Sequence, residues 1–357
     1  MNKQVGGAVA ISVGTGGRCV GKVVRSARVL AALAAVGIEM LSGVTPALAQ
    51  SATWLNPPTV MNPDGHFNFD AGANWDTGTA PGSMNFTGIA TFGTSTGTDI
   101  SFSSNSTALD GFTFNAAANY TFFNNNTQLD FFGAGIAVNG GSAAFTNSGL
   151  HGSMLFFNGS TAGSAAITNS SGAVTTFGIV GGTDNASAGM ANITNNSDGL
   201  TLFFARTTAG TATITNNNGG STQFGQAGGV DIANAGMAMI TNNSGGTTVF
   251  NAVTTAGTAT IANNGGTTQF GESGGTDTAT AGNATITNNN GGTTVFNAGT
   301  MAGGATITNS NIGGTNFFDN SNAVSATITN NNDGVTHFNA NSMAGSAKIT
   351  NNSGFWK

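Results

Sequence analysis

Three aspartates have the setting that most suggests chemistry, because Asp184, Asp231 and Asp277 each follow a Gly-Gly pair and one further residue. This spacing partly matches the Gly-Gly-x-Gly-x-Asp repeat that binds Ca²⁺ in parallel β-helices. The third glycine is missing, however, and one carboxylate per copy is few for an ion that takes about six to eight oxygen ligands. We therefore expect solvated turn aspartates and no metal ion or other cofactor.

Other catalytic patterns are weaker. Gly93–Gly97 fits the Gly-x-Ser-x-Gly nucleophile elbow, but that motif needs a strand-to-helix turn, and no helical periodicity surrounds it. The three histidines, His66, His151 and His337, share no metal-ligand spacing. Since a chain rich in glycine and serine produces such a match by chance, no catalytic residue is expected.

A carbohydrate-active enzyme, either a polysaccharide lyase or a glycosidase, is the alternative function. A glycosidase needs two carboxylates flanking the scissile bond, whereas Asp198 and Asp333 precede glycines at the turn of a repeat. A lyase would need basic residues to stabilise an acidic sugar, and Arg206 is the only arginine after residue 49. Both observations favour a protein that is not an enzyme.

Threonine pairs provide a third candidate surface. Both members of a Thr-x-Thr pair face the same side of a strand, so stacked pairs would form a flat array that resembles the faces of ice-binding solenoids. Met239, Ala262 and Lys348 interrupt the array, which favours ordinary exposed strands. The candidate residues are Thr213, Thr215, Thr285, Thr287, Thr306, Thr308, Thr327 and Thr329.

The elements that position these residues are written as a repeat. Nearly the same line, Ala-x-Ile-Thr-Asn, recurs nine times between Ile167 and Ile349, at intervals of 21, 25 or 26 residues. A period of this length indicates a solenoid of stacked coils. Alternation of apolar and polar residues within each copy is typical of strands, and no helical period competes with it.

Two apolar columns and one amide column are expected inside the coils. A phenylalanine follows the isoleucine by ten residues in most copies, and Phe270 is the exception at nine. Because neighbouring strands lie about 4.8 Å apart, each isoleucine and each phenylalanine would stack on its counterpart, and inward asparagines would form an amide ladder. We therefore predict an all-β fold, a parallel β-helix with about 21–26 residues per coil.

Three coils are longer than the others by four or five residues. The extra residues lie in three segments that we call the long loops, 178–184, 225–231 and 271–277, which occur on every second coil. Insertions in solenoids map to loops on one face, often the binding face. The long loops and their aspartates should therefore protrude in a row, roughly 10 Å apart.

The regions before the regular repeats differ in composition. Residues 1–49 have the three parts of an export signal, with basic residues up to Arg28, a short apolar run and an Ala-x-Ala site before Gln50. Residues 50–150 hold four of the five prolines and are expected to form an N-terminal cap with irregular first coils. Regular repeats should then occupy residues 151–357.

Charge limits the partners of the chain after residue 49. Three basic and thirteen acidic side chains leave a net charge of −10 there. Nucleic acid and anionic membranes are bound by clustered lysine and arginine, so neither is expected as a partner. The single cysteine, Cys19, lies within the expected signal, which leaves no cysteine for a disulfide framework.

The whole pattern resembles the passenger region of an autotransporter, a self-exporting bacterial surface protein of type V secretion. The features that carry the resemblance are the signal ending at Ala49, the Thr53-Trp54-Leu55 and Ala73-Asn74-Trp75 motifs, and the repeats. The resemblance implies a right-handed parallel β-helix displayed outside the outer membrane, commonly as an adhesin. It also implies a translocator β-barrel, which these 357 residues lack, so the uncapped last coil would offer an edge for self-association.

These observations predict a non-catalytic protein that is exported to the cell surface or the extracellular space. It would act as an adhesin or a structural stalk through repeated weak contacts along one face. Its partner would be a glycan or a protein on the surface of a host or neighbouring cell.

Overall fold

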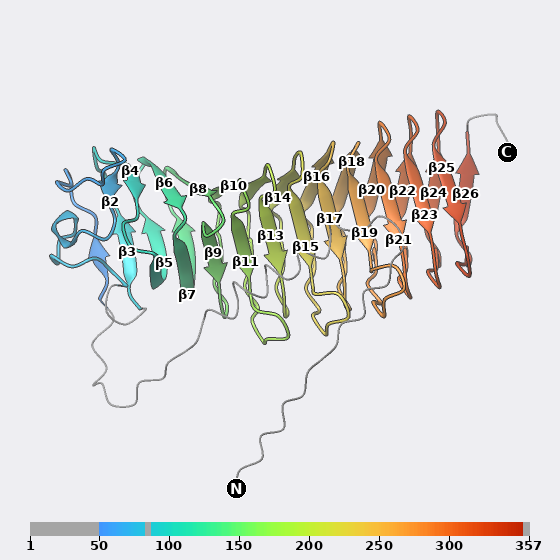
Figure 1. The fold of residues 1–357 in the computed structure, drawn as a ribbon, viewed down its shortest axis with the longest axis horizontal. Helices are drawn as coiled ribbons and strands as arrows, with labels where there is room; N and C mark the ends of the chain where they lie inside the picture. The colour runs from blue at the N-terminus through green and yellow to red at the C-terminus, as the bar shows by residue number, and fades with distance from the viewer. Residues whose placement is uncertain (1–49, 83–86, 353–357) are drawn as a thin grey trace, which may run out of the picture. The chain divides into compact units, whose positions relative to one another are not determined.

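The computed structural model describes residues 50–82 and 87–352, which form an all-β solenoid of stacked parallel coils (Figure 1). The expected export signal, residues 1–49, lies outside the described residues. The one helical element in the described ranges is a 3₁₀ turn, Gly72–Asn74. No described helix has the length and apolar character needed to span a bilayer. The predicted parallel β-helix is confirmed.

Each coil contributes one strand to each of two thirteen-stranded parallel sheets. The first sheet consists of β1 (Ala52–Thr53), β3 (Ile89–Phe92), β5 (Ser106–Phe114), β7 (Gln128–Val138), β9 (Ser153–Phe156), β11 (Val174–Phe177), β13 (Leu200–Phe203), β15 (Ser221–Phe224), β17 (Thr247–Phe250), β19 (Thr267–Phe270), β21 (Thr293–Phe296), β23 (Gly314–Phe317) and β25 (Val335–Phe338). The second sheet consists of β2 (Phe67–Asn68), β4 (Asp99–Ser101), β6 (Asn119–Asn125), β8 (Ser142–Ser148), β10 (Ala166–Asn169), β12 (Asn192–Asn195), β14 (Thr213–Asn216), β16 (Met239–Asn243), β18 (Thr260–Asn264), β20 (Thr285–Asn289), β22 (Thr306–Asn309), β24 (Thr327–Asn330) and β26 (Lys348–Asn351).

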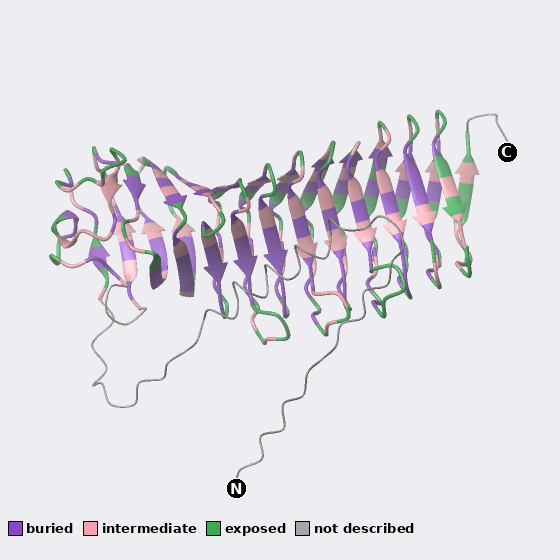
Figure 2. Cartoon of the chain, in the orientation of Figure 1, coloured by how far each residue is buried: buried purple, intermediate pink, exposed green. Residues whose placement is uncertain are grey.

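The register of the sheets follows the sequence repeat. Ile193 of β12 pairs with Ile167 of β10 on one side and with Ile214 of β14 on the other. A slip of one residue would turn every buried side chain of a strand outwards. The differences in coil length therefore lie in the connections, and the buried bands of Figure 2 run from coil to coil.

The phenylalanines form the predicted column. Successive ring centroids from Phe131 to Phe338 lie 4.6–4.9 Å apart, with nearly parallel rings. Phe270 keeps its place, at 4.8 Å from Phe250 and 4.7 Å from Phe296. Its coil is shorter in the turn, since only two residues, 265–266, separate β18 from β19, whereas three separate β16 from β17.

The inward asparagines form the predicted amide ladder. Ten hydrogen bonds of 2.7–3.1 Å connect the side-chain amides of consecutive coils from Asn124 to Asn351, and every bond runs from Nδ2 to the Oδ1 of the next coil. A buried threonine of the facing strand donates to the same oxygen, as Thr248 does to Asn242 at 2.9 Å. From Asn147 onwards the core therefore contains a polar column in which donors and acceptors match, as buried polar groups require, whereas the Oδ1 of the first member, Asn124, has no partner.

The Gly-Gly turn after this ladder has a steric reason. Gly219 has a φ of +87°, and a Cβ on Gly220 would lie 2.0 Å from the backbone oxygen of Asn195 in the preceding coil. A side chain at the first position would be strained, and a side chain at the second would prevent the coils from stacking.

In the regular coils, the third side is held by single parallel bridges. They connect nine consecutive coils from Thr161 to Met343. The inward residues beside them are alanines such as Ala209 and Ala212, which are fully buried. Because these side chains are small, the backbone of the third side lies close to the apolar columns. This explains the alanine at the first position of each Ala-x-Ile-Thr-Asn repeat.

The N-terminal coils belong to the same two sheets and have a more aromatic core. Trp54 and Trp75 form an antiparallel bridge and an edge-to-face contact with ring centroids 5.0 Å apart. Their indole N–H groups donate to the backbone oxygens of Gly97 and Phe69, at 2.9 and 2.7 Å. These bonds satisfy the polar edge of each buried indole.

Candidate functional site

The three long loops lie along one edge of the solenoid, as predicted. They follow β11, β15 and β19, and Figure 1 shows them side by side below these strands. Between neighbouring long loops lies one coil without an insertion. These two shorter coils contain Phe203 and Phe250. The row of loops is therefore the most irregular surface of the regular coils.

The prediction that the loop aspartates are solvated is wrong. Asp231 is 1% exposed and Asp277 is 2% exposed, and Asp184 is half-buried. The two Asp231 oxygens accept backbone N–H groups from Ala205 at 2.7 Å, Gly181 at 3.0 Å and Gln226 at 3.0 Å. The carboxylate is thus buried because its charge is compensated by peptide donors.

Asp277 repeats this arrangement one loop further along. It accepts N–H groups from Ala252 at 2.6 Å, Gly228 at 3.0 Å and Glu272 at 3.0 Å. Each of the two carboxylates therefore joins its own loop, the corner of the preceding coil and the long loop two coils back. Asp184 makes two such bonds, to Asn158 at 2.6 Å and to Ile179 at 3.0 Å.

Sequence reasoning missed Asp319, which holds the last long loop although its own coil has no insertion. Its Oδ2 accepts N–H groups from Ala298 and Gly274, both at 3.1 Å. The only signal for it was the recurrence of an acidic residue two coils after each long loop. The aspartates are therefore structural clasps between coils, and their oxygens are occupied by the backbone.

The remaining catalytic and metal candidates are not brought together. The described residues contain no group of three or more His, Cys, Asp or Glu side chains placed to hold a metal ion. Ser95, in the Gly-x-Ser-x-Gly segment, donates its hydroxyl to the backbone oxygen of Leu55 at 2.9 Å. His66 stacks on Phe123 with ring centroids 4.0 Å apart, and Asp198 and Asp333 have the positive φ of turn residues.

The carboxyl group of Asp130 has a raised pKa. Asp130 on β7 is 5% exposed, and burial raises its pKa to about 6 despite a hydrogen bond from Gln128 Nε2 to its Oδ2 at 2.7 Å. Its Oδ1 has no hydrogen-bond partner. Loss of hydration accounts for the shift, which alters the pH dependence of stability.

The candidate threonines lie on the outer face of the second sheet. Thr287 pairs with Thr308, and Thr308 pairs with Thr329. Met239 stands between Thr213 and Thr260 in the neighbouring column, and Ala262 stands between Thr241 and Thr287. The columns are therefore stacked as expected and are interrupted where the sequence predicted.

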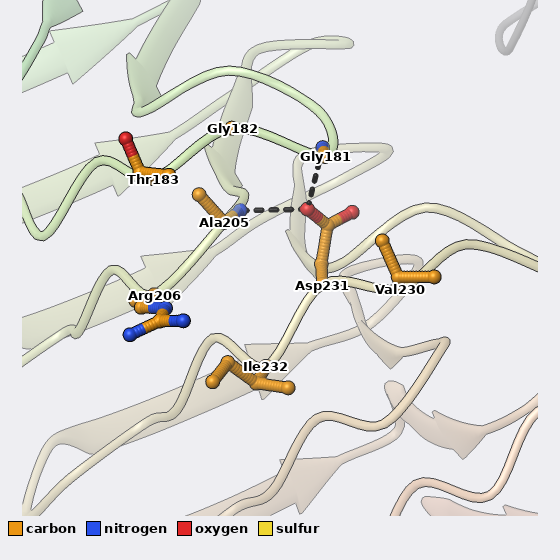
Figure 3. Close-up of a pocket in the computed structure, with 8 residues that line it drawn as sticks. All are labelled: Gly181, Gly182, Thr183, Ala205, Arg206, Val230, Asp231 and Ile232. Carbon is orange, nitrogen blue, oxygen red and sulfur yellow. Dashed lines mark hydrogen bonds between the residues drawn. The ribbon is translucent and has the colours of Figure 1, made fainter.

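A pocket of about 350 Å³ lies between the first two long loops. Figure 3 shows its lining: Gly181, Gly182 and Thr183 from the first loop, Val230, Asp231 and Ile232 at the second, and Ala205 and Arg206 from the coil between them. In the described ranges, the Arg206 side chain forms neither an ion pair nor a hydrogen bond. Arg206 entered the sequence reasoning only as a count of arginines, because its pocket is built from residues up to about 50 positions apart in the chain.

The fold and the site together define a parallel β-solenoid that carries a row of long loops along one edge. Comparisons of the chain with protein-family models, with curated proteins and with solved structures found no match.

Proposed function

We propose that this protein is a non-catalytic, exported β-solenoid that adheres to a neighbouring surface through its row of long loops. The observation that carries the proposal is the contrast between the interior of the coils and the part of the loop edge that runs from the first long loop to Val253. The interior is filled by phenylalanine, isoleucine, alanine and the asparagine–threonine ladder, whereas the loop edge exposes apolar side chains. These are Ile179, Val180, Val230, Ile232 and Val253, which are 36–75% exposed.

A rigid stack with loops at a regular spacing suits multivalent attachment. Each loop contact alone is expected to be weak, and several contacts on one rod gain from effective concentration without any new interaction. The aspartate clasps support this role, because they restrict the loops before binding and so reduce the entropy lost on binding. The partner on a host or neighbouring cell would be a protein or a glycan.

The adhesion test compares beads that carry residues 50–357 with beads that carry a loop-shortened variant. In this variant, residues 178–186, 225–233 and 271–279 are each replaced by the four residues Asn-Ala-Val-Thr, the connection that this chain itself uses at 251–254. Beads with the natural chain should be retained on cell layers under flow, with retention rising steeply with protein density. The loop-shortened beads should wash off.

Two results would contradict the proposal. Equal retention of both kinds of bead, with the variant still folded by circular dichroism, would remove the long loops from the binding surface. Release of reducing ends or unsaturated sugars from a polysaccharide panel by the purified protein would favour the carbohydrate-active alternative.

Export has a separate test. The full chain and a chain lacking residues 2–49 are expressed in a Gram-negative host, and the cell fractions are compared. We expect the full chain outside the cytoplasm, shortened at its N-terminus, and the truncated chain inside. Identical distribution of the two would contradict the export signal.

A further inference from the structure

We propose that the pocket between the first two long loops binds the C-terminal carboxylate of a peptide that ends in a small aliphatic residue. This inference rests on the proposed function, because it names the ligand class of the same loop edge. It is carried by the charge, the lining and an internal comparison within the repeat.

The charge is that of Arg206. Its exposed guanidinium has no partner in the described ranges, and the other basic residue there is Lys348. A guanidinium binds a carboxylate through two parallel hydrogen bonds. The pocket holds one cation, in a part of the chain where thirteen acidic side chains outnumber three basic ones. A single cation matches a single negative charge, and the acidic surroundings disfavour polyanions.

The nearby aspartates leave this cation unpaired. Asp231 directs its oxygens at three backbone N–H groups, and Asp184 directs its oxygens at Asn158 and Ile179. Their negative charge is therefore balanced by peptide donors, and Arg206 remains the one charged side chain of the pocket that can receive a partner from outside.

The rest of the lining matches a small aliphatic group. Val230 is 75% exposed and Ile232 is 48% exposed, and Figure 3 shows Arg206 and Thr183 on one side of the view and Val230 on the other. Gly181 and Gly182 bring the backbone to the pocket without side chains. A volume of about 350 Å³ is at the small end of ligand sites. The Gly181 and Ala205 N–H groups already donate to Asp231, so Arg206 would supply the hydrogen bonds to the carboxylate.

The next pair of long loops provides an equivalent position, in which the residues that correspond to the pocket lining have different side chains. Between the second and third long loops, Val253 replaces Arg206, Thr276 replaces Val230, Thr278 replaces Ile232, and Val230 itself takes the place of Thr183. The backbone is held in the same way, because Asp277 binds Ala252 and Gly228 as Asp231 binds Ala205 and Gly181. The two positions therefore differ in side chains on a common frame, and only the first combines a cation with two exposed aliphatic groups.

Calorimetric titration of residues 50–357 with acetyl-Gly-Val as the free acid tests the assignment. We expect one binding site, with the C-terminal amide of the same peptide bound at least about 10-fold more weakly. Arg206→Val, which copies the second position, should weaken acid binding about 10- to 100-fold, the range for a hydrogen bond to a charged group. Arg206→Lys keeps the charge but loses the paired donors. Its affinity for the acid should lie between those of the natural protein and Arg206→Val.

A gain of function provides the matched control. The triple variant Val253→Arg, Thr276→Val and Thr278→Ile should raise the stoichiometry from one peptide to two. Equal binding of acid and amide, an unchanged affinity in Arg206→Val, or tighter binding of glucuronic acid than of the peptide would each overturn the assignment. If the peptide fails to bind while natural beads still adhere to cells, only this inference falls; if the beads also fail to adhere, the proposed function falls with it.

Discussion

The asparagine ladder allows a sharp test of what holds the coils together. Asn242 is fully buried in a central coil and accepts from Asn216 Nδ2 at 2.8 Å and from Thr248 Oγ1 at 2.9 Å. It donates to Asn263 Oδ1 at 2.8 Å. We predict that Asn242→Leu, which keeps a similar volume and removes these bonds, destabilises the solenoid strongly.

The magnitude follows from which partners are left unsatisfied. Asn216 still donates to the backbone oxygen of Thr247 at 3.0 Å, and Asn263 Oδ1 still accepts from Thr268 at 2.9 Å. Loss of the Asn216–Asn242 bond and loss of the Asn242–Asn263 bond should therefore cost about 1 kcal/mol each. The Thr248 hydroxyl loses its acceptor in a dry core, which costs about 1–3 kcal/mol. The free energy of unfolding should fall by about 3–5 kcal/mol.

Urea unfolding of the single and double variants separates hydrogen bonding from packing. Thr248→Val alone should cost about 1 kcal/mol, and the double variant should cost less than the sum of the two, because the orphaned hydroxyl is gone. Asn217 is the control, since it belongs to a half-buried outer row, donates to Asn196 at 2.9 Å and accepts from Asn243 at 2.7 Å. Asn217→Ala should change stability by less than about 1 kcal/mol because water replaces both bonds.

Two outcomes would refute this reasoning. A neutral Asn242→Leu would mean that apolar packing alone holds the coils together. Strictly additive costs in the double variant would mean that the ladder and the Thr248 hydroxyl do not depend on each other.

Three further predictions follow from the same contacts. Burial raises the pKa of Asp130 from 3.8 to about 6, so the folded protein binds a proton that the unfolded chain has lost between these values. Wild-type stability should therefore fall as pH rises from about 4 to 6. Asp130→Asn should abolish this fall and add up to about 3 kcal/mol of stability at pH 7. Melting temperatures measured across pH test this, and a parallel pH profile in the variant would contradict it. Asp277→Ala removes the acceptor of three backbone N–H groups and should speed hydrogen exchange at the Ala252 amide at least about 10-fold. Added Ca²⁺ or chelator should leave the wild-type melting temperature unchanged. Phe250→Ala should lower the free energy of unfolding by about 3–5 kcal/mol, clearly more than Phe338→Ala, because Phe338 is half-buried at the end of the column. Equal urea midpoints for the two variants would argue against the column as a stabilising element.

Much of the fold followed from local patterns. The alternation around Ile214 and Phe224 sets which side chains face inwards, and the fixed period sets which residues lie above them, so two columns and the row of loops were predictable. Phe270 shows the limit of counting, because the deviation from ten to nine residues is absorbed by a shorter turn. That compensation depends on backbone geometry, which spacing alone does not contain.

The candidate site was less predictable. The Gly-Gly-x-Asp pattern identified the loops but indicated solvated carboxylates, because the donors that bury Asp231 belong to Ala205 and Gly181, 26 and 50 residues earlier. The Arg206 pocket requires two loops and the coil between them to stand at their final spacing. Neither feature leaves a signal within one copy of the repeat.

The sequence by itself determined the class of object, since period-two alternation inside a period of 21–26 residues can bury its apolar side chains only by stacking coil on coil. Tertiary structure alone decided the chemistry of the loop edge. Consecutive coils lie 21 to 26 residues apart in the chain, and the long loops of alternate coils also meet. There backbone N–H groups bury Asp231, and Arg206 has no side-chain partner among the described residues.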